Sequence, residues 1–205
     1  IAIDIDLSVR EDADAVLEKQ QIVAAQLSKG GQWPDGNRIK EIGSSAIFEN
    51  EDTAGETRAR AEASGADLSR LLITRDIFDL STPAGVAALE RKLDTLDNPK
   101  LVMLSPVRMF FGASEGHRQT VTRTRLEPLL AMAARRKISI IGVGHREAGK
   151  KGNSAEEMAG PKGLTQRARA VLNVTEDTSD PVYKLHPKRA RRLLVSAGTN
   201  NGDDT

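Results

Sequence analysis

Hydrophobic and polar residues alternate over residues 1–9, and this period of two indicates a half-buried strand. Over residues 12–29 the apolar residues recur three or four positions apart instead, as they do on one face of a helix. Gly30 and Gly31 interrupt that spacing, and the turn-forming segment 33–36 follows. The chain is therefore predicted to open with a strand followed by a helix.

The same two patterns alternate through the middle of the chain. Apolar strand-like runs are followed by helix-like segments, the second of which has Ser81 or Thr82 as its predicted N-cap. After the last apolar run, strand-like segments follow one another without a helical signal between them. The pattern predicts strands at 44–48, 70–74, 100–104 and 138–143, helices at 53–64, 83–96 and 120–136, and closing strands at 170–174, 182–185 and 192–195.

The apolar runs at 100–104 and 138–143 are continuous rather than alternating. Continuous runs flanked by helices are typical of a mostly parallel sheet that is covered on both faces, which is an α/β fold. The closing segments predict antiparallel strands at one edge of this sheet. We expect a single domain over residues 1–198 and a polar tail over 199–205.

Composition narrows the function classes. Aromatic residues make up 3% of the 205 residues, so the core must be aliphatic, and the formal charge of +1 excludes a strongly cationic coat for nucleic acid. With no cysteine and three histidines, we expect no disulfide, no thiolate nucleophile and no metal-ligand set. No apolar run reaches the roughly 18 residues of a membrane span and no signal segment opens the sequence, so we expect a cytoplasmic protein without a membrane partner.

Ligands of open parallel sheets bind beyond the carboxyl ends of the strands. The segments to inspect are therefore those that follow the predicted strands. Two of them belong to a series of motifs whose order and spacing are specific. The motifs are Leu101-Val-Met-Leu-Ser-Pro-Val107, Gly116-His-Arg118, Thr124-Arg-Leu-Glu-Pro-Leu-Leu-Ala-Met-Ala133 and Ile140-Ile-Gly-Val-Gly-His145.

This series resembles the second half of the RecA-like ATPase domain. It is most similar to prophage and plasmid replication ATPases related to hexameric replicative helicases, and segments 33–36, 65–70 and 163–174 share the similarity. The resemblance spans about residues 11–185. It implies a RecA-like fold that binds ATP and Mg²⁺, assembles as a homo-oligomeric ring and acts on single- or double-stranded DNA during replication or recombination of a mobile element.

The resemblance implies a P-loop, which needs glycines, a lysine and a hydroxyl residue around the phosphates. Its pattern places Ala13 and Glu18 at the glycines, Lys19 at the lysine and Gln20 at the hydroxyl. Only Lys19 is retained, and the Glu18 carboxylate repels a polyanion. Lys19 could also be a solvated lysine on an amphipathic helix.

Two carboxyl-edge positions of the family fall on Ser105 and Glu51. Where relatives have an aspartate that orders magnesium-bound water, Ser105 offers a hydroxyl without charge, or it only caps the turn before Pro106. Glu51 takes the place of the glutamate that polarises the attacking water, and Glu49 is its rival. In isolation, this acidic loop could also be merely solvated.

The resemblance gives His145, at the end of an apolar strand, the role of sensing the γ-phosphate. The alternative is a strand-end histidine bonded to backbone. The Gly- and Lys-rich loop that follows corresponds to a loop that contacts single-stranded DNA in helicase relatives, and its candidate DNA-binding residues are Arg146, Lys150 and Lys151. Because parallel strands end at one edge, Lys19, Glu51, Ser105 and His145 are expected to cluster there.

Two arginines precede the first closing strand. The resemblance places Arg167 and Arg169 where they reach a nucleotide in a neighbouring subunit, whereas the alternative is salt bridging to acidic helices. The basic run 188–192 either binds phosphate backbone or protects an edge strand by its charge, and we favour the edge strand.

Two function hypotheses remain. The first is a RecA-like ATPase or helicase in which the substituted motifs impair ATP binding and hydrolysis. The second is a pseudo-ATPase that serves as a DNA-binding or helicase-loading module. An unrelated α/β enzyme has little support, because the sequence contains no nucleophile–base pair, no G-x-G-x-x-G motif and no metal-ligand spacing.

Overall fold

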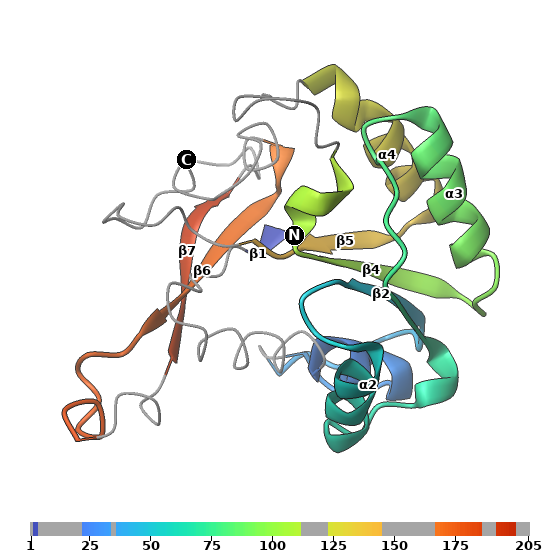
Figure 1. Cartoon of the computed structure of the whole chain (residues 1–205). Coiled ribbons are helices and arrows are strands. Elements are labelled where there is room, and N and C mark those ends of the chain that lie inside the picture. The colour runs from blue at the N-terminus through green and yellow to red at the C-terminus, as the bar shows by residue number, and fades with distance from the viewer. Residues whose placement is uncertain are drawn as a thin grey trace.

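The computed structural model describes residues 2–3, 22–33, 36–111, 123–144, 167–185 and 192–199. At its centre is a four-stranded sheet in the order β3-β2-β4-β5, and every neighbouring pair in it is parallel (Figure 1). This arrangement confirms the α/β fold that the apolar runs predict. The strands are β2 (Ser44–Glu49), β3 (Leu71–Thr74), β4 (Pro99–Ser105) and β5 (Ser139–Gly142).

Helices cover both faces of this sheet. Side chains alternate between the two faces along each strand, and apolar side chains on each face pack against helices. Ala46, Phe48, Val102 and Leu104 face α3 (Pro83–Leu93) and α4 (Arg123–Arg136). The alternate positions, among them Ile47 and Met103, face α2 (Ala54–Ala63) and the helix over residues 22–29. Figure 1 shows α3 and α4 on one side of the sheet and α2 on the other.

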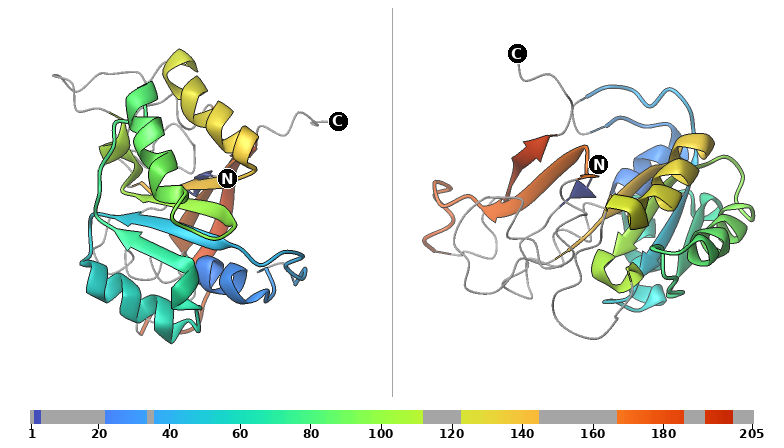
Figure 2. Two further views of the ribbon diagram at one scale, coloured as in Figure 1. Left: turned by 90° about the vertical axis from the view of Figure 1, so that its right-hand side faces the viewer. Right: turned by 90° about the horizontal axis from the view of Figure 1, so that it is seen from above.

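The closing strands form a second, three-stranded sheet. In it β1 (Ala2–Ile3) runs parallel to β6 (Ala170–Glu176), and β6 runs antiparallel to β7 (Arg192–Thr199). β1 also contacts β5, and Figure 2 shows β6 and β7 extending away from α3 and α4. The predicted antiparallel pairing of the closing strands is thus confirmed, but these strands form a separate sheet instead of extending the parallel one, and β7 continues to Thr199, one residue into the segment predicted as a tail.

The predicted strand at 182–185 is wrong, because these residues form consecutive turns. The Tyr183 and Leu185 N–H groups donate to the carbonyls of Asp180 and Val182, at 2.9 and 3.1 Å. The Asp180 carboxylate accepts from the Val182 N–H at 2.9 Å. Aspartate side chains that bond the backbone two residues on compete with strand pairing, and here they outweigh the apolar run.

Capping residues set the helix boundaries. Thr53 and Glu56 form a reciprocal capping box at the start of α2, and Gly65 follows its last turn with φ of +73°. Thr82, one of the two predicted caps, accepts from the Gly85 N–H at 3.1 Å to begin α3. The helix ends at Leu93 instead of residue 96, and residues 94–96 form turns.

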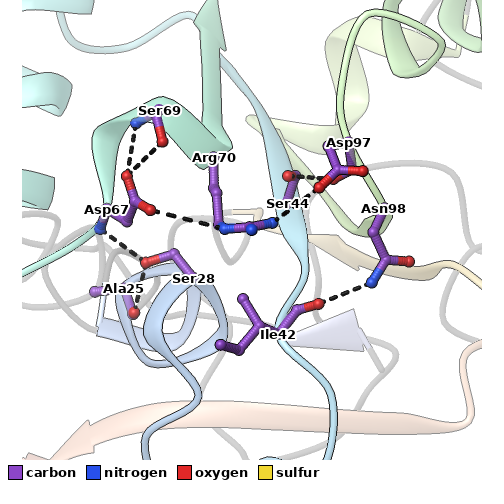
Figure 3. Close-up of polar contacts among 9 residues, drawn as sticks. All are labelled: Ala25, Ser28, Ile42, Ser44, Asp67, Ser69, Arg70, Asp97 and Asn98. Atoms are coloured by element: carbon purple, nitrogen blue, oxygen red, sulfur yellow. Dashed lines mark hydrogen bonds and ion pairs between the residues drawn. The ribbon is translucent and has the colours of Figure 1, made fainter.

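Polar contacts join the amino ends of the strands to the neighbouring segments (Figure 3). Ser28 donates to the Ala25 carbonyl at 2.8 Å and accepts from the Asp67 N–H at 2.9 Å. Arg70 lies between Asp67 and Asp97, with nitrogen–oxygen distances of 3.7 and 3.4 Å. These contacts fix the helix over residues 22–29 against the turn that leads into β3.

We expect Ser28→Ala to lower the free energy of unfolding by about 1–2 kcal/mol, because it leaves the Asp67 N–H without its acceptor. Urea denaturation measures the change. Ser69→Ala is the matched control, since the Ser69 hydroxyl makes an exposed contact with the Asp67 carboxylate, and its loss should cost less than about 0.5 kcal/mol. Equal losses in the two variants would contradict this ranking.

Candidate functional site

The carboxyl ends of β2, β4 and β5 lie at one edge of the sheet. Glu49, the last residue of β2, pairs in register with Ser105, the last residue of β4. The Val143 N–H donates to the Leu104 carbonyl at 2.9 Å, so the chain leaves β5 at this same edge. Glu51 follows two residues after β2, and the structure therefore brings Glu51 and Ser105 to one edge, as predicted.

The remaining predicted residues of this edge lie outside the described residues. They are Lys19, Gln20, His145, Arg146, Lys150 and Lys151. Gly144, which directly precedes His145, is buried where the chain leaves β5. The expected clustering of Lys19 and His145 with Ser105 therefore stays a prediction.

Glu49 is a buried carboxyl group at the centre of this edge, with 2% of its surface exposed. Its Oε1 accepts from the Glu51 N–H at 2.8 Å. Burial raises the pKa of Glu49 above its ordinary value, while the adjacent Glu51 N–H, Ser105 hydroxyl and Asp52 N–H oppose this rise. Desolvation is the largest of these effects, so the pocket around Glu49 disfavours a charge.

Ser105 is fully buried, and its hydroxyl lies close enough to Glu49 to influence that carboxyl group. Among the described residues, however, the hydroxyl has no hydrogen-bond partner of ordinary geometry, and the same holds for the Asn50 side-chain nitrogen. Two buried polar groups at one strand edge fit a site that receives a polar ligand or water. Ser105 can hydrogen-bond a metal-bound water there but adds no charge.

The described part of the chain holds no ready-made set of metal ligands. No group of three or more His, Cys, Asp or Glu residues within it could hold an ion. The Ser105 hydroxyl therefore fits a magnesium–nucleotide complex as a hydrogen-bonding partner rather than as a ligand set. The phosphate groups and water would have to supply the oxygen ligands.

Glu51 lies on the short loop between β2 and α2, and its side chain is exposed. On the same loop, Asp52 forms an ion pair with Arg60 of α2. Because Glu49 points inward and Glu51 outward, Glu51 is the carboxylate of the two that an external ligand can reach. Its proposed action on water remains a prediction.

Arg167 and Arg169 lie next to α4. The Arg167 guanidinium pairs with Glu127 of α4, which is the kind of salt bridge that the sequence left open as an alternative. Arg169 is exposed. Both arginines line a groove of about 760 Å³ whose other residues come mainly from α4 and β5, with Leu104 of β4 and Val107 also in its lining.

The basic run 188–192 enters the described residues only at Arg192, the first residue of β7. Within the described sheet, β7 has a single neighbour, β6, and so lies at an edge. This position favours the interpretation that the charge of the basic run protects an edge strand from pairing with other chains.

Asn50 was not identified from the sequence, and Glu49 appeared there only as a rival of Glu51. Asn50 donates from its backbone N–H to the Ser105 carbonyl at 2.9 Å, so it connects the two strand ends. The one available signal was an acidic residue directly after a buried apolar strand. Its meaning depends on the register between β2 and β4, which local sequence does not contain.

Comparisons with known proteins agree with this architecture. The model of the AAA domain family matches residues 21–152. Among solved structures, the RadB recombinase is similar with a TM-score of 0.50 and 15% identity, over 87% of this chain and 76% of the RadB chain. None of the curated proteins matches the sequence. In the described residues, no helix is long and apolar enough to cross a membrane.

Proposed function

Because this chain belongs to the AAA domain family and has the RecA-like fold of P-loop ATPases, we propose that it acts on DNA while binding ATP weakly and hydrolysing it slowly. The finer proposal is a homo-oligomeric, ring-forming ATPase of the replication or recombination of a mobile element, located in the cytoplasm. Residues 1–198 would form its single RecA-like domain. The structural similarity to a recombinase supports the proposal that the chain acts on DNA.

The observation that carries the proposal is the uncharged end of β4. Ser105 stands at the strand end where the resemblance implies a magnesium-ordering aspartate, and its hydroxyl has no hydrogen-bond partner among the described residues. The neighbouring Glu49 carboxyl is buried in surroundings that disfavour charge. When bound, Mg²⁺ neutralises phosphate charge, and a site with less negative charge holds it less tightly.

In this proposal, individual residues of the chain have separate roles in ATP binding and hydrolysis. Lys19 would donate to the phosphates, and Ser105 would accept a hydrogen bond from metal-bound water. Glu51, the reachable carboxylate of the edge, would orient the attacking water. Glu18 opposes binding: two unit charges about 4 Å apart interact by roughly 1 kcal/mol in water and about 4 kcal/mol at an effective dielectric constant near 20.

The test is calorimetry with ATP and Mg²⁺ on the unmodified chain and on a Glu18→Gly, Gln20→Ser variant. We expect a Kd near 1 mM for the unmodified chain, which is about −4 kcal/mol. The variant should bind at least about tenfold tighter, since it removes the repulsion and restores the hydroxyl. A Lys19→Ala change on the variant background is the control and should abolish the gain.

Tight binding and rapid turnover by the unmodified chain would contradict the proposal.

The second candidate function, a pseudo-ATPase that binds DNA or loads a helicase, is favoured by the same uncharged strand end. Fluorescence anisotropy with labelled single- and double-stranded DNA distinguishes the two. A motor should change its DNA affinity with ATP, whereas a pseudo-ATPase should bind DNA equally with and without it.

A further inference from the structure

The loop between β2 and α2 is fixed through its backbone amides. The Asn50 N–H donates to the Ser105 carbonyl at 2.9 Å, and the Glu51 N–H donates to Glu49 Oε1 at 2.8 Å. The Asp52 N–H lies close enough to the Glu49 carboxyl group to lower its pKa. At the end of the loop, the Thr53 N–H donates to Glu56 Oε2 at 3.0 Å. Three of these four consecutive amides are thus hydrogen-bonded, and the Glu49 carboxyl group lies beside the middle two.

At the position of Glu49, burying an apolar side chain would cost less free energy than burying a carboxyl group. It ends a strand whose six residues are all buried, and removing a carboxyl group from water costs several kcal/mol unless hydrogen bonds offset it. The Glu51 amide offsets this cost through its hydrogen bond, and the nearby Ser105 hydroxyl and Asp52 amide also favour the charged carboxylate. All three belong to the two segments that would face a nucleotide at this edge.

We infer that Glu49 is a positioning residue that holds the main chain of Glu51 and Asp52 in place, so that Glu51 stays at the carboxyl edge of the sheet. This inference rests on the proposed function, in which Glu51 orients the attacking water. Glu49 itself does not touch substrate, because its carboxyl group faces the loop amides and Ser105 from within the sheet edge. It acts on hydrolysis only through the placement of Glu51.

Glutamine is the informative replacement for Glu49. It has nearly the same shape, but its side chain offers one acceptor oxygen and an NH₂ group, whereas the carboxylate offers two acceptor oxygens. One of the two loop amides would therefore face a donor instead of an acceptor. The loop should loosen while the strand remains packed.

Turnover is measured in the Glu18→Gly, Gln20→Ser background, where ATP binding is restored. We expect Glu51→Gln to lower kcat about 100-fold, as for the loss of a general base. Glu49→Gln should lower kcat about tenfold without changing KM for ATP, because a small displacement of Glu51 slows the reaction. The double variant should be no slower than Glu51→Gln alone, since Glu49 acts through Glu51.

Amide hydrogen exchange, followed by NMR in the otherwise unmodified chain, provides a readout that does not need activity. Glu49→Gln should speed exchange at the Glu51 and Asp52 amides at least about tenfold, as expected for a local opening that leaves the rest of the fold intact. Exchange within β4 should not change. Ser45→Ala is the matched control, because it removes another buried polar group of β2 and should leave the loop amides unaffected.

The outcomes distinguish the positioning role inferred for Glu49 from the role proposed for Glu51. If Glu51→Gln slows turnover but Glu49→Gln does not, or if their effects multiply in the double variant, the inference is wrong and the proposed function stands. If Glu51→Gln leaves turnover unchanged, the proposed role of Glu51 fails and the inference fails with it. Unchanged exchange at the two loop amides would also overturn the inference, whatever the kinetics.

Discussion

Replacing Phe48 by alanine is expected to lower the free energy of unfolding by about 3–5 kcal/mol, the range found for large core aromatics. Phe48 directly precedes Glu49, the last residue of β2, and has 0% of its surface exposed. Its ring meets Phe78 and Phe110 edge-on, with centroids 5.7 and 6.2 Å apart. The loss combines burial, a cavity and these ring contacts, which add about 0.5–1.5 kcal/mol per pair.

Urea denaturation followed by circular dichroism measures this loss. Ile77→Ala is the matched control, because Ile77 is a large apolar residue that is 48% exposed, and it should change the free energy of unfolding by less than about 1 kcal/mol. Only four of the 205 residues are phenylalanines, so Phe48 and Phe110 carry much of the aromatic packing. Similar losses for Phe48→Ala and Ile77→Ala would show that the core does not centre on this ring.

Ser105→Asp, the change that restores the aspartate of the family, is expected to destabilise the chain by about 3 kcal/mol at neutral pH. The new carboxylate would lie beside Glu49, its partner in register, and both positions are buried. Two adjacent buried carboxylates cannot both ionise cheaply, and an uncompensated buried charge costs about 3–5 kcal/mol. The uncharged Ser105 thus suits the presence of Glu49.

The loss should depend on pH in a defined direction. Burial already raises the pKa of Glu49, and a second carboxyl group raises the pKa values of the pair further. Carboxyl groups whose pKa is higher in the folded than in the unfolded protein stabilise the fold below about pH 4, and this stability is lost as the pH rises. The deficit of Ser105→Asp relative to the unmodified chain should therefore be small near pH 4 and grow toward pH 7.

Urea denaturation from pH 4 to pH 8 tests this dependence. Adding Glu49→Gln to Ser105→Asp should recover most of the loss at pH 7, because a single carboxyl group then remains. A deficit that is independent of pH, or that Glu49→Gln does not relieve, would mean that the cost of Ser105→Asp is steric rather than electrostatic.

Local sequence predicted the fold well wherever local physics decides it. The continuous apolar runs correctly indicated buried parallel strands, because both faces of such a strand are covered. Thr53 and Thr82 marked helix starts through side-chain caps that act within three residues. Where two local preferences compete, the pattern failed: the apolar residues at 182–185 indicated a strand, but the aspartates before them form turns.

The site was predictable only in part. The sequence placed Glu51 and Ser105 after strands, and the rule that parallel strands end together predicted that they share an edge. It could not decide between Glu49 and Glu51, because their difference in burial depends on how β2 sits between its neighbours. It also left the partner of Arg167 open, since Glu127 is 40 positions away and meets it only when α4 packs against the sheet.

What the sequence determined by itself is the fold class and its strand–helix alternation, since these follow from residue types and spacings along the chain. The tertiary structure alone decided that Glu49 is buried against Ser105, where its carboxyl group accepts from the Glu51 N–H. The physical reason is register. Strands β2 and β4 are separated by some fifty residues of chain, and only their pairing brings the Ser105 hydroxyl next to the Glu49 carboxyl group, whereas the Glu51 amide reaches Glu49 through a local contact.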